Sequence, residues 1–231
     1  MTILTQVRKR RMVRDGISHG MSEVHGKRNP FVAQEGILPM LVMATACVLL
    51  ILYYNPWSAL VPGIIFAFMY LLFRDPLRVV PPVALGVVSP VDGEVVAVET
   101  TDKCVIQGEA HLIRIRINGL GTYTARSPVE GKVMDLHSSV QGVGPECPAN
   151  ALWVQTDEGD SVVLQFQGYR FGLAPRSFVR YGERIGQGHR CAYLRLAEFA
   201  EVYMPIDGKV LVEPGQQVVA GTDPIGTVPH S

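Results

Sequence analysis

The sequence lacks an excess of charge of either sign, because 21 lysines and arginines balance 21 aspartates and glutamates over 231 residues. Without net charge, no long-range attraction draws the whole chain to nucleic acid, and we expect no nucleic-acid partner. Cysteine is scarce, and its four copies form neither a C-x-x-C metal pattern nor the paired spacing of a disulfide framework. The six histidines show no ligand spacing, so the sequence predicts no metal site.

Charge is also absent from one long segment near the N-terminus. Residues 36–73 contain no Asp, Glu, Lys, Arg or His over 38 positions, about twice the roughly 20 apolar residues that cross a bilayer once. Because proline disfavours helix at the residue before it, Pro56 predicts two transmembrane helices, over 37–54 and 57–73, joined by a tight turn. A cleaved signal peptide and a buried core hairpin are the alternatives, but a signal peptide has a shorter apolar stretch that begins earlier.

Basic residues flank this segment at its two ends and are missing from its middle. Residues 1–35 hold seven lysines and arginines, the turn holds none, and Arg74 and Arg78 follow the second helix. Since lysine and arginine resist translocation, both termini and the domain after the hairpin are expected on the cytoplasmic side of the inner membrane. The basic cluster at 8–14 is interpreted as a topogenic signal, with contact to anionic lipid head groups as the alternative.

The remainder of the chain predicts a mainly β domain. After residue 81, short runs of valine, isoleucine and aromatic residues alternate with polar ones and are bounded by Gly, Pro and Asp. We therefore divide the chain into a basic cytoplasmic segment (1–35), a transmembrane helical hairpin (36–73) and a β domain (74–231).

A short phrase recurs three times in the β domain, at 89–95, 127–133 and 204–210. Each copy carries Pro, an acidic residue and Gly before a β-branched run, which is typical of a turn that enters a strand. With the Gly-x-x-Val-x-x-Gly pattern near the C-terminus, the phrase resembles the flattened β barrels of lipoyl and biotinyl carriers. The modified lysine of those carriers has no counterpart, since Lys209 begins a strand instead of forming a hairpin tip.

The order of the motifs is similar to that of a known family. An apolar hairpin, then Phe73-Arg-Asp-Pro-Leu-Arg78, then Val-Ser-Pro-Val-Asp-Gly at 88–93 and Arg-Ser-Pro-Val-Glu-Gly-Lys-Val at 126–133, resembles the short membrane-associated form of phosphatidylserine decarboxylase. The resemblance continues through 182–190 and 202–205 and covers roughly residues 36–228. It implies a lipoyl-like β domain and a role in phospholipid metabolism.

Members of that family convert an internal serine to a pyruvoyl group with the help of an aspartate and a histidine. Carried onto this chain, the aspartate is Asp92, the histidine position holds Tyr123, and the serine position holds Glu198. Glutamate has no β-hydroxyl, and a phenol with a pKa near 10 is a poor base at neutral pH. We therefore expect an uncleaved chain without a pyruvoyl group or any other cofactor.

Several interpretations of these positions stay open. Asp92 is either a relic of catalysis or simply a turn residue, since the other two copies of the phrase carry Glu130 and Asp207 there. Asp92, Tyr123 and Glu198 either form a new acid-base centre or have drifted, with Glu198 neutralised by a nearby arginine. Three arginines are the candidates for that neutralising role: Arg126, Arg190 and Arg195.

The expected partner is a phospholipid membrane, with head-group contacts from Arg74, Arg78 and Arg126, because guanidinium groups bind phosphate oxygens in pairs. The leading hypothesis is a lipid-binding or scaffolding homologue without decarboxylase activity, with a protein partner or a homo-oligomer as possible assemblies. The first alternative is an active decarboxylase that forms phosphatidylethanolamine by an atypical processing route. The second is a membrane-fusion adaptor, although the heptads of an adaptor hairpin are missing.

Overall fold

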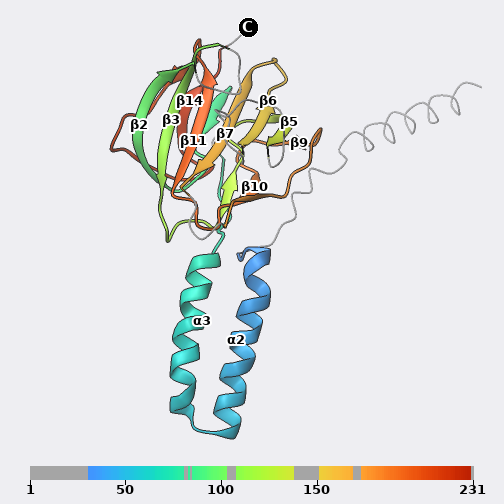
Figure 1. Cartoon of the computed structure of the whole chain (residues 1–231), viewed down its shortest axis with the longest axis vertical. Coiled ribbons are helices and arrows are strands. Elements are labelled where there is room, and N and C mark those ends of the chain that lie inside the picture. Colours follow the sequence, from blue (N-terminus) through green and yellow to red (C-terminus); the bar gives the residue numbers. More distant parts are fainter. Residues whose placement is uncertain are drawn as a thin grey trace, which may run out of the picture.

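The computed structural model of the chain describes residues 31–80, 83, 85–102, 108–137, 151–168 and 173–229. Two long helices form an antiparallel hairpin that projects from one end of a β domain (Figure 1). Most of the predicted basic N-terminal segment lies outside the described residues.

The hairpin consists of helix α2 (Gln34–Tyr53), the 3-10 turn η1 (Pro56–Ala59) and helix α3 (Leu60–Phe73). Asn55 caps the turn, because its side chain accepts a hydrogen bond from the backbone N–H of Trp57 at 3.2 Å. Both helices are long and apolar enough to cross a membrane, and a 20-residue helix is about 30 Å long. Their exposed side chains exclude the buried core hairpin that the sequence left as an alternative.

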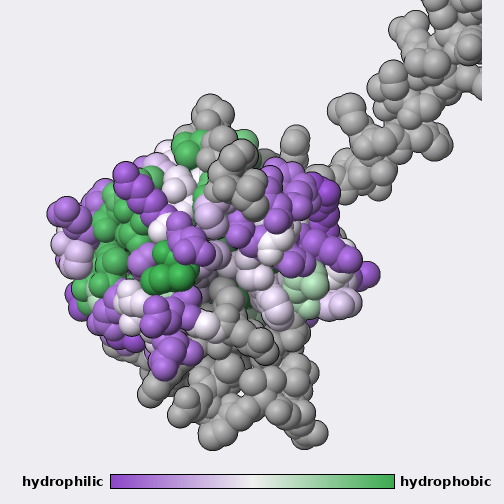
Figure 2. Space-filling model, turned by 90° about the horizontal axis from the view of Figure 1, so that it is seen from above, coloured by the Kyte–Doolittle hydropathy of each residue, from purple (hydrophilic) through white to green (hydrophobic). Residues whose placement is uncertain are grey.

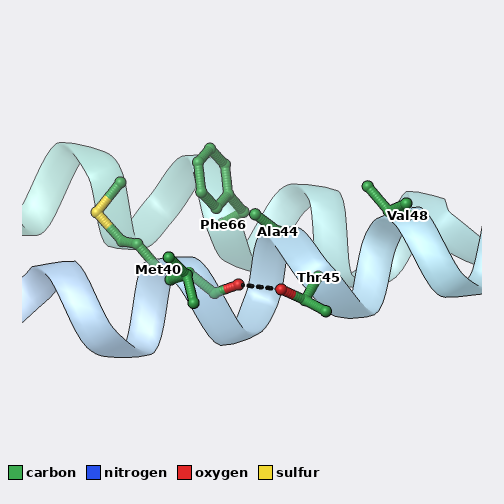
Figure 3. A pocket seen from close by; sticks show the side chains of 6 residues that line it. Met40, Ala44, Thr45, Val48 and Phe66 are labelled. Carbon is green, nitrogen blue, oxygen red and sulfur yellow. Dashed lines mark hydrogen bonds between the residues drawn. The ribbon is translucent and has the colours of Figure 1, made fainter.

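An open apolar groove runs between the two helices (Figure 3). The one polar side chain among the residues that line it, Thr45, donates its hydroxyl proton to the carbonyl of Leu41 at 2.8 Å. Because this hydrogen bond satisfies the hydroxyl within its own helix, the groove presents apolar surface. Five apolar residues complete the lining: Met40, Leu41, Ala44, Val48 and Phe66.

The β domain consists of three antiparallel sheets. The strands are β1 (Gly86–Val88), β2 (Gly93–Thr101), β3 (Ala110–Ile117), β4 (Thr124–Arg126), β5 (Gly131–His137), β6 (Ala151–Gln155), β7 (Ser161–Gln167), β8 (Arg176–Ser177), β9 (Arg184–Ile185), β10 (Arg190–Tyr193), β11 (Phe199–Pro205), β12 (Lys209–Val210), β13 (Gln217–Val218) and β14 (Pro224–Thr227). The large sheet has the order β13-β2-β3-β11-β7-β6-β5-β9, and the small sheets have the orders β1-β14-β12 and β4-β10-β8. The prediction of a mainly β domain behind two apolar helices is confirmed.

The repeated phrase forms the same turn at two of its copies. The hydroxyl of Ser89 donates to the carbonyl of Val91 at 2.7 Å, and the hydroxyl of Ser127 donates to the carbonyl of Val129 at 2.8 Å. The glycine in each of these two copies, Gly93 or Gly131, begins β2 or β5, where a Cβ atom would lie about 2 Å from a backbone oxygen of the next strand. Glycine is therefore required for this close approach, and the predicted turn before a strand is confirmed.

The large sheet buries side chains on both faces. Along β11, Ala200, Val202 and Met204 point into the main hydrophobic core, as the alternation of a strand requires. Tyr203 points to the opposite face, where it packs in a smaller cluster with Leu112, Ala151 and Val163. The end of the domain away from the hairpin is hydrophilic over much of its surface, with a larger apolar area on one side and smaller ones elsewhere (Figure 2).

Candidate functional site at the hairpin end of the sheet

Two of the three predicted site positions flank the end of one strand. The backbone N–H of Asn118, just after β3, donates to the carbonyl of Asp92 at 2.8 Å, and the N–H of Ile117 donates to the carbonyl of Glu198 at 2.9 Å. Asp92 therefore lies on one side of β3 and Glu198 on the other, roughly 10 Å apart at the backbone because strands are spaced by about 4.8 Å. Both are close to the hairpin: Arg78, in the segment after α3, binds Asp92, and Arg195, three residues before Glu198, pairs with a carboxylate in the first turn of α2.

Asp92 is held by three hydrogen bonds. Its carboxylate accepts from the guanidinium of Arg78 at 2.9 Å, from the N–H of Thr122 at 3.0 Å and from the N–H of Ala220 at 2.8 Å. The corresponding residue in the second copy of the phrase, Glu130, is exposed, and its one contact among the described residues is a long ion pair to Arg184 at 3.8 Å. The turn forms without such hydrogen bonds in the second copy, so they are not needed for the turn itself. In the first copy they connect Asp92 to the segments that contain Arg78, Thr122 and Ala220.

Tyr123 is engaged by the hairpin. Its hydroxyl donates to the carboxylate of Glu35, in the first turn of α2, at 2.9 Å, and its ring lies 4.7 Å from the ring of Phe73 at the end of α3. Burial raises the pKa of Tyr123 well above its ordinary value, and the hydrogen bond to Glu35 raises it further. The phenol therefore stays protonated at neutral pH and is not a base.

Glu198 is half-buried beside a glycine. Its backbone N–H donates to the carbonyl of Gln167 at 3.1 Å, which fixes the residue just before β11. A Cβ atom at Gly168, where φ is +70°, would lie 3.0 Å from the Cβ of Glu198, so the two chain segments approach closely. Within the part of the chain that the structure describes, the carboxylate of Glu198 has no hydrogen bond or ion pair.

Among the described residues, no hydrogen bond joins the side chains of Asp92, Tyr123 and Glu198 to one another. The expectation that a nearby arginine neutralises Glu198 is not borne out, because all three candidates bind other carboxylates. Arg195 pairs with Glu35 at 2.7 Å, and Arg126 and Arg190 pair with Asp75. Asp92 and Glu198 thus flank the same strand end, but only the carboxylate of Asp92 has hydrogen-bond partners among the described residues.

Asp75 anchors the segment that links α3 to the β domain. The side chain is almost fully buried and lies 2.6 Å from Arg190 and 3.5 Å from Arg126, and the hydroxyl of Thr124 donates to it at 2.7 Å. Two arginines and a hydroxyl compensate the buried charge, as a charge away from water requires. The sequence analysis did not single out Asp75 or Glu35. The one feature of the sequence that could have indicated them is that each is a carboxylate at the end of an apolar helix.

The three arginines proposed for lipid contact differ in exposure. Arg74 is exposed at the end of α3, Arg78 is half-buried against Asp92, and Arg126 is buried. Arg126 donates to the carbonyls of Gly188 at 3.0 Å and Pro76 at 2.8 Å in addition to its ion pair. Of the three, Arg74 is the one whose guanidinium is free to meet lipid without breaking a contact that the structure shows.

Glu201 is a further buried carboxylate that the sequence analysis missed. It lies on β11, three residues after Glu198, and is 0% exposed. Arg114 donates to one carboxylate oxygen at 2.7 Å, and Gln167 and Tyr203 donate to the other at 2.7 and 2.9 Å. This network fixes β11 to its two neighbours, β3 and β7, directly behind the site.

The residues at the site do not fit the prosthetic group of the related enzymes. A pyruvoyl group arises from a serine, and Glu198 carries a carbon where the serine oxygen would be. Cys191, the one conceivable substitute nucleophile near this position, is fully buried, which raises the pKa of its thiol to about 12. The described residues also contain no group of three His, Cys, Asp or Glu side chains arranged to hold a metal ion.

Comparisons of the sequence with known proteins identify relatives over most of its length. No family model matches the chain. The chain is 33% identical to the phosphatidylserine decarboxylase proenzyme of Nitrosomonas europaea over 204 residues, which are 83% of this chain and 93% of the relative. It is 31% identical to the protein of the same name from Burkholderia ambifaria over 84% of this chain and 94% of the relative.

Among solved structures, glucose permease IIA from Mycoplasma capricolum aligns with a TM-score of 0.42 and 19% identity, over 62% of this chain and 94% of that one. This likeness is too weak to assign a fold.

Proposed function

This chain belongs to the phosphatidylserine decarboxylase family, and we propose that it is a membrane-anchored member that does not form a pyruvoyl group. In this proposal it acts on the phospholipid membrane as a lipid-binding or scaffolding protein, alone, with a protein partner or as a homo-oligomer. The proposal departs from the names of the relatives compared above, which are called proenzymes.

One observation carries the proposal, namely the residue at position 198. Self-processing in this family begins when a serine hydroxyl attacks the preceding carbonyl carbon, and it ends with elimination of that oxygen from the β-carbon. Glu198 offers no such oxygen, and Tyr123, at the histidine position, stays protonated because of burial and its bond to Glu35. Neither the nucleophile nor the base of this self-processing reaction is present at its expected position.

The membrane part of the proposal is supported by the hairpin. We place α2 and α3 across the inner membrane with both termini and the β domain on the cytoplasmic side, following the distribution of basic residues around them. Arg74 then lies at the head-group level, and Arg78 and Arg126 lie behind it. We further propose that the β domain is a flattened barrel related to the lipoyl carriers, which the repeated turns before β2, β5 and β12 support.

The intact mass of the purified protein tests the loss of processing. We expect a single species near 25.3 kDa that gains no mass after treatment with hydrazine, which traps α-keto groups. Two fragments that add up to the full chain, or a hydrazone adduct on either one, overturn the proposal.

The competing hypothesis, an active decarboxylase, is tested with labelled phosphatidylserine supplied to the full-length protein in vesicles. We expect no labelled phosphatidylethanolamine. Product that forms with the wild type and with Glu130→Gln, but not with Asp92→Asn, supports the enzyme and refutes our proposal. Glu130→Gln is the matched control because Glu130 occupies the same place in the repeated turn and is exposed.

A further inference from the structure

Large apolar side chains are exposed on the loops that surround the candidate site. We call them the hairpin-side rim, and their exposed fractions lie between 38% and 66%. None of them belongs to the two helices, so the transmembrane hairpin does not account for their exposure. The rim consists of five residues: Leu77, Leu120, Leu173, Phe178 and Leu196.

Contacts of their neighbours in the chain place three of these residues beside the hairpin. Leu196 follows Arg195, whose guanidinium pairs with Glu35 at the start of α2. Leu173 precedes Ala174, whose carbonyl accepts a hydrogen bond from the same guanidinium at 3.4 Å. Leu77 lies in the linker, two residues after the buried anchor Asp75.

The remaining two rim residues lie at the same end. Leu120 belongs to the short loop between Asn118 and Thr122, which is bonded to Asp92 at both ends. The ring of Phe178 lies 5.1 Å from the ring of Tyr193, which in turn lies 5.9 Å from that of Tyr123 and so continues the aromatic stack that begins at Phe73. The rim residues therefore lie around the site, at the end of the domain that contacts the hairpin.

Exposed arginines accompany this apolar surface. Arg74 follows the last residue of α3, and Arg116 is the penultimate residue of β3. Arg176 lies close enough to influence Glu35 and Tyr193 electrostatically. An apolar surface edged by cations is the composition that binds the boundary between acyl chains and anionic head groups.

We propose that the hairpin-side rim inserts into the surface of an anionic bilayer, in the leaflet from which the hairpin enters. The proposal rests on the proposed function, in which α2 and α3 span that bilayer. The rim is continuous with the apolar hairpin, because each rim residue lies on the side from which the spanning helices leave the domain. This favours a bilayer over a second copy of the chain as the surface that the rim contacts. In this arrangement Asp92 and Glu198 open toward lipid head groups, and a phospholipid reaches them without leaving the membrane.

Depth measurements on the full-length protein in vesicles test this arrangement. Single cysteines replace Leu120, Leu196, Ile206 or Leu41 in a chain whose native cysteines are serine, and each carries an environment-sensitive fluorophore. The vesicles contain phosphatidylcholine with a minority of phosphatidylglycerol and a lipid-attached quencher. Leu41 is an exposed position within α2 and reports whether the hairpin is inserted.

Ile206 is the matched control for the rim. It is 37% exposed, close to the 40% of Leu196, but it follows the far end of β11. Seven strand residues separate the two ends, a distance of roughly 20 Å. An exposed apolar residue at that end cannot reach a bilayer that the hairpin spans.

We expect labels at 120 and 196 to be quenched several-fold more than the label at 206. Rim labels that match the label at 206, while the label at 41 is quenched, overturn the rim proposal and leave the anchor intact. A label at 41 that is not quenched overturns the anchor, and the rim proposal with it. Rim labels with blue-shifted emission that lipid quenchers do not reach show that protein covers the rim, which also refutes the proposal.

Discussion

Glu201 allows a quantitative test of the network behind the site. The change Glu201→Gln keeps the size of the side chain, removes its charge and replaces one acceptor oxygen with an NH2 group. That group must then face Arg114, or else Gln167 and Tyr203, all of which donate to the carboxylate in the wild type. If the NH2 group faces Arg114, the guanidinium loses its acceptor, and if it faces Gln167 and Tyr203, their amide and hydroxyl must turn to accept instead of donate. In both cases the charge-assisted hydrogen bonds of the buried carboxylate are lost.

The magnitude follows from burial. Removal of one partner from a buried ion pair costs about 3–5 kcal/mol, and the carboxylate is 1% exposed. The side chain of Arg114 is 39% exposed, so its guanidinium recovers part of its hydration when the charge opposite it is lost. We therefore expect Glu201→Gln to lower the free energy of unfolding by about 2–4 kcal/mol.

Urea unfolding of the full-length chain in detergent micelles measures this loss. Of the two tryptophans, Trp153 lies on β6 and Trp57 lies in the hairpin turn, so a Trp57→Phe background makes fluorescence a probe of the β domain alone. Glu130→Gln is the control, since its exposed pair with Arg184 contributes at most about 1 kcal/mol. A Glu201→Gln protein within about 0.5 kcal/mol of this control refutes the reasoning.

Three further outcomes follow from the site. Because the pKa of Tyr123 is raised, the folded state holds the phenolic proton more tightly than the unfolded state does. The stability that Tyr123 contributes should therefore fall as the pH rises above about 10, the pKa of an ordinary phenol. A stability advantage of the wild type over Tyr123→Phe that grows above that pH contradicts this. Cys191 should react with a maleimide only after unfolding, in a variant whose other three cysteines are serine, since burial raises its pKa to about 12; labelling of the native protein at pH 8 speaks against its burial. Glu35→Gln should speed proteolysis of the loop at Arg195 by weakening its half-buried ion pair, measured by limited trypsin digestion, and unchanged cleavage kinetics show that the pair is dispensable.

Local patterns were enough to predict the parts of the fold that neighbouring residues determine. An uncharged run broken by Asn55-Pro56 specified the hairpin, because helix length and proline geometry depend on residues close in sequence. The structure begins α2 at Gln34, a few residues earlier than predicted, since the helix continues into the polar residues that contact the β domain. The repeated Pro-acid-Gly phrase likewise specified the turns before β2, β5 and β12.

Partners that are distant in sequence could not be predicted in the same way. Glu35 and Arg195 are 160 positions apart, and no spacing or periodicity links them. The family resemblance gave the positions of Asp92, Tyr123 and Glu198 but not the partners of their side chains. Arg78 reaches Asp92 from the linker and Glu35 reaches Tyr123 from the hairpin, so both segments take part in the site.

The hairpin is fixed to the β domain at both of its legs, by Glu35 at the start of α2 and by Asp75 just after α3. A hairpin attached to the domain at one point can rotate relative to it, whereas attachment at two separate points couples the rotation of the hairpin to that of the domain. A bilayer that is thinner or thicker than the helices tilts them. If α2 and α3 span the bilayer as proposed, that tilt turns the whole β domain, so the thickness of the surrounding lipid sets the angle at which the domain meets the membrane.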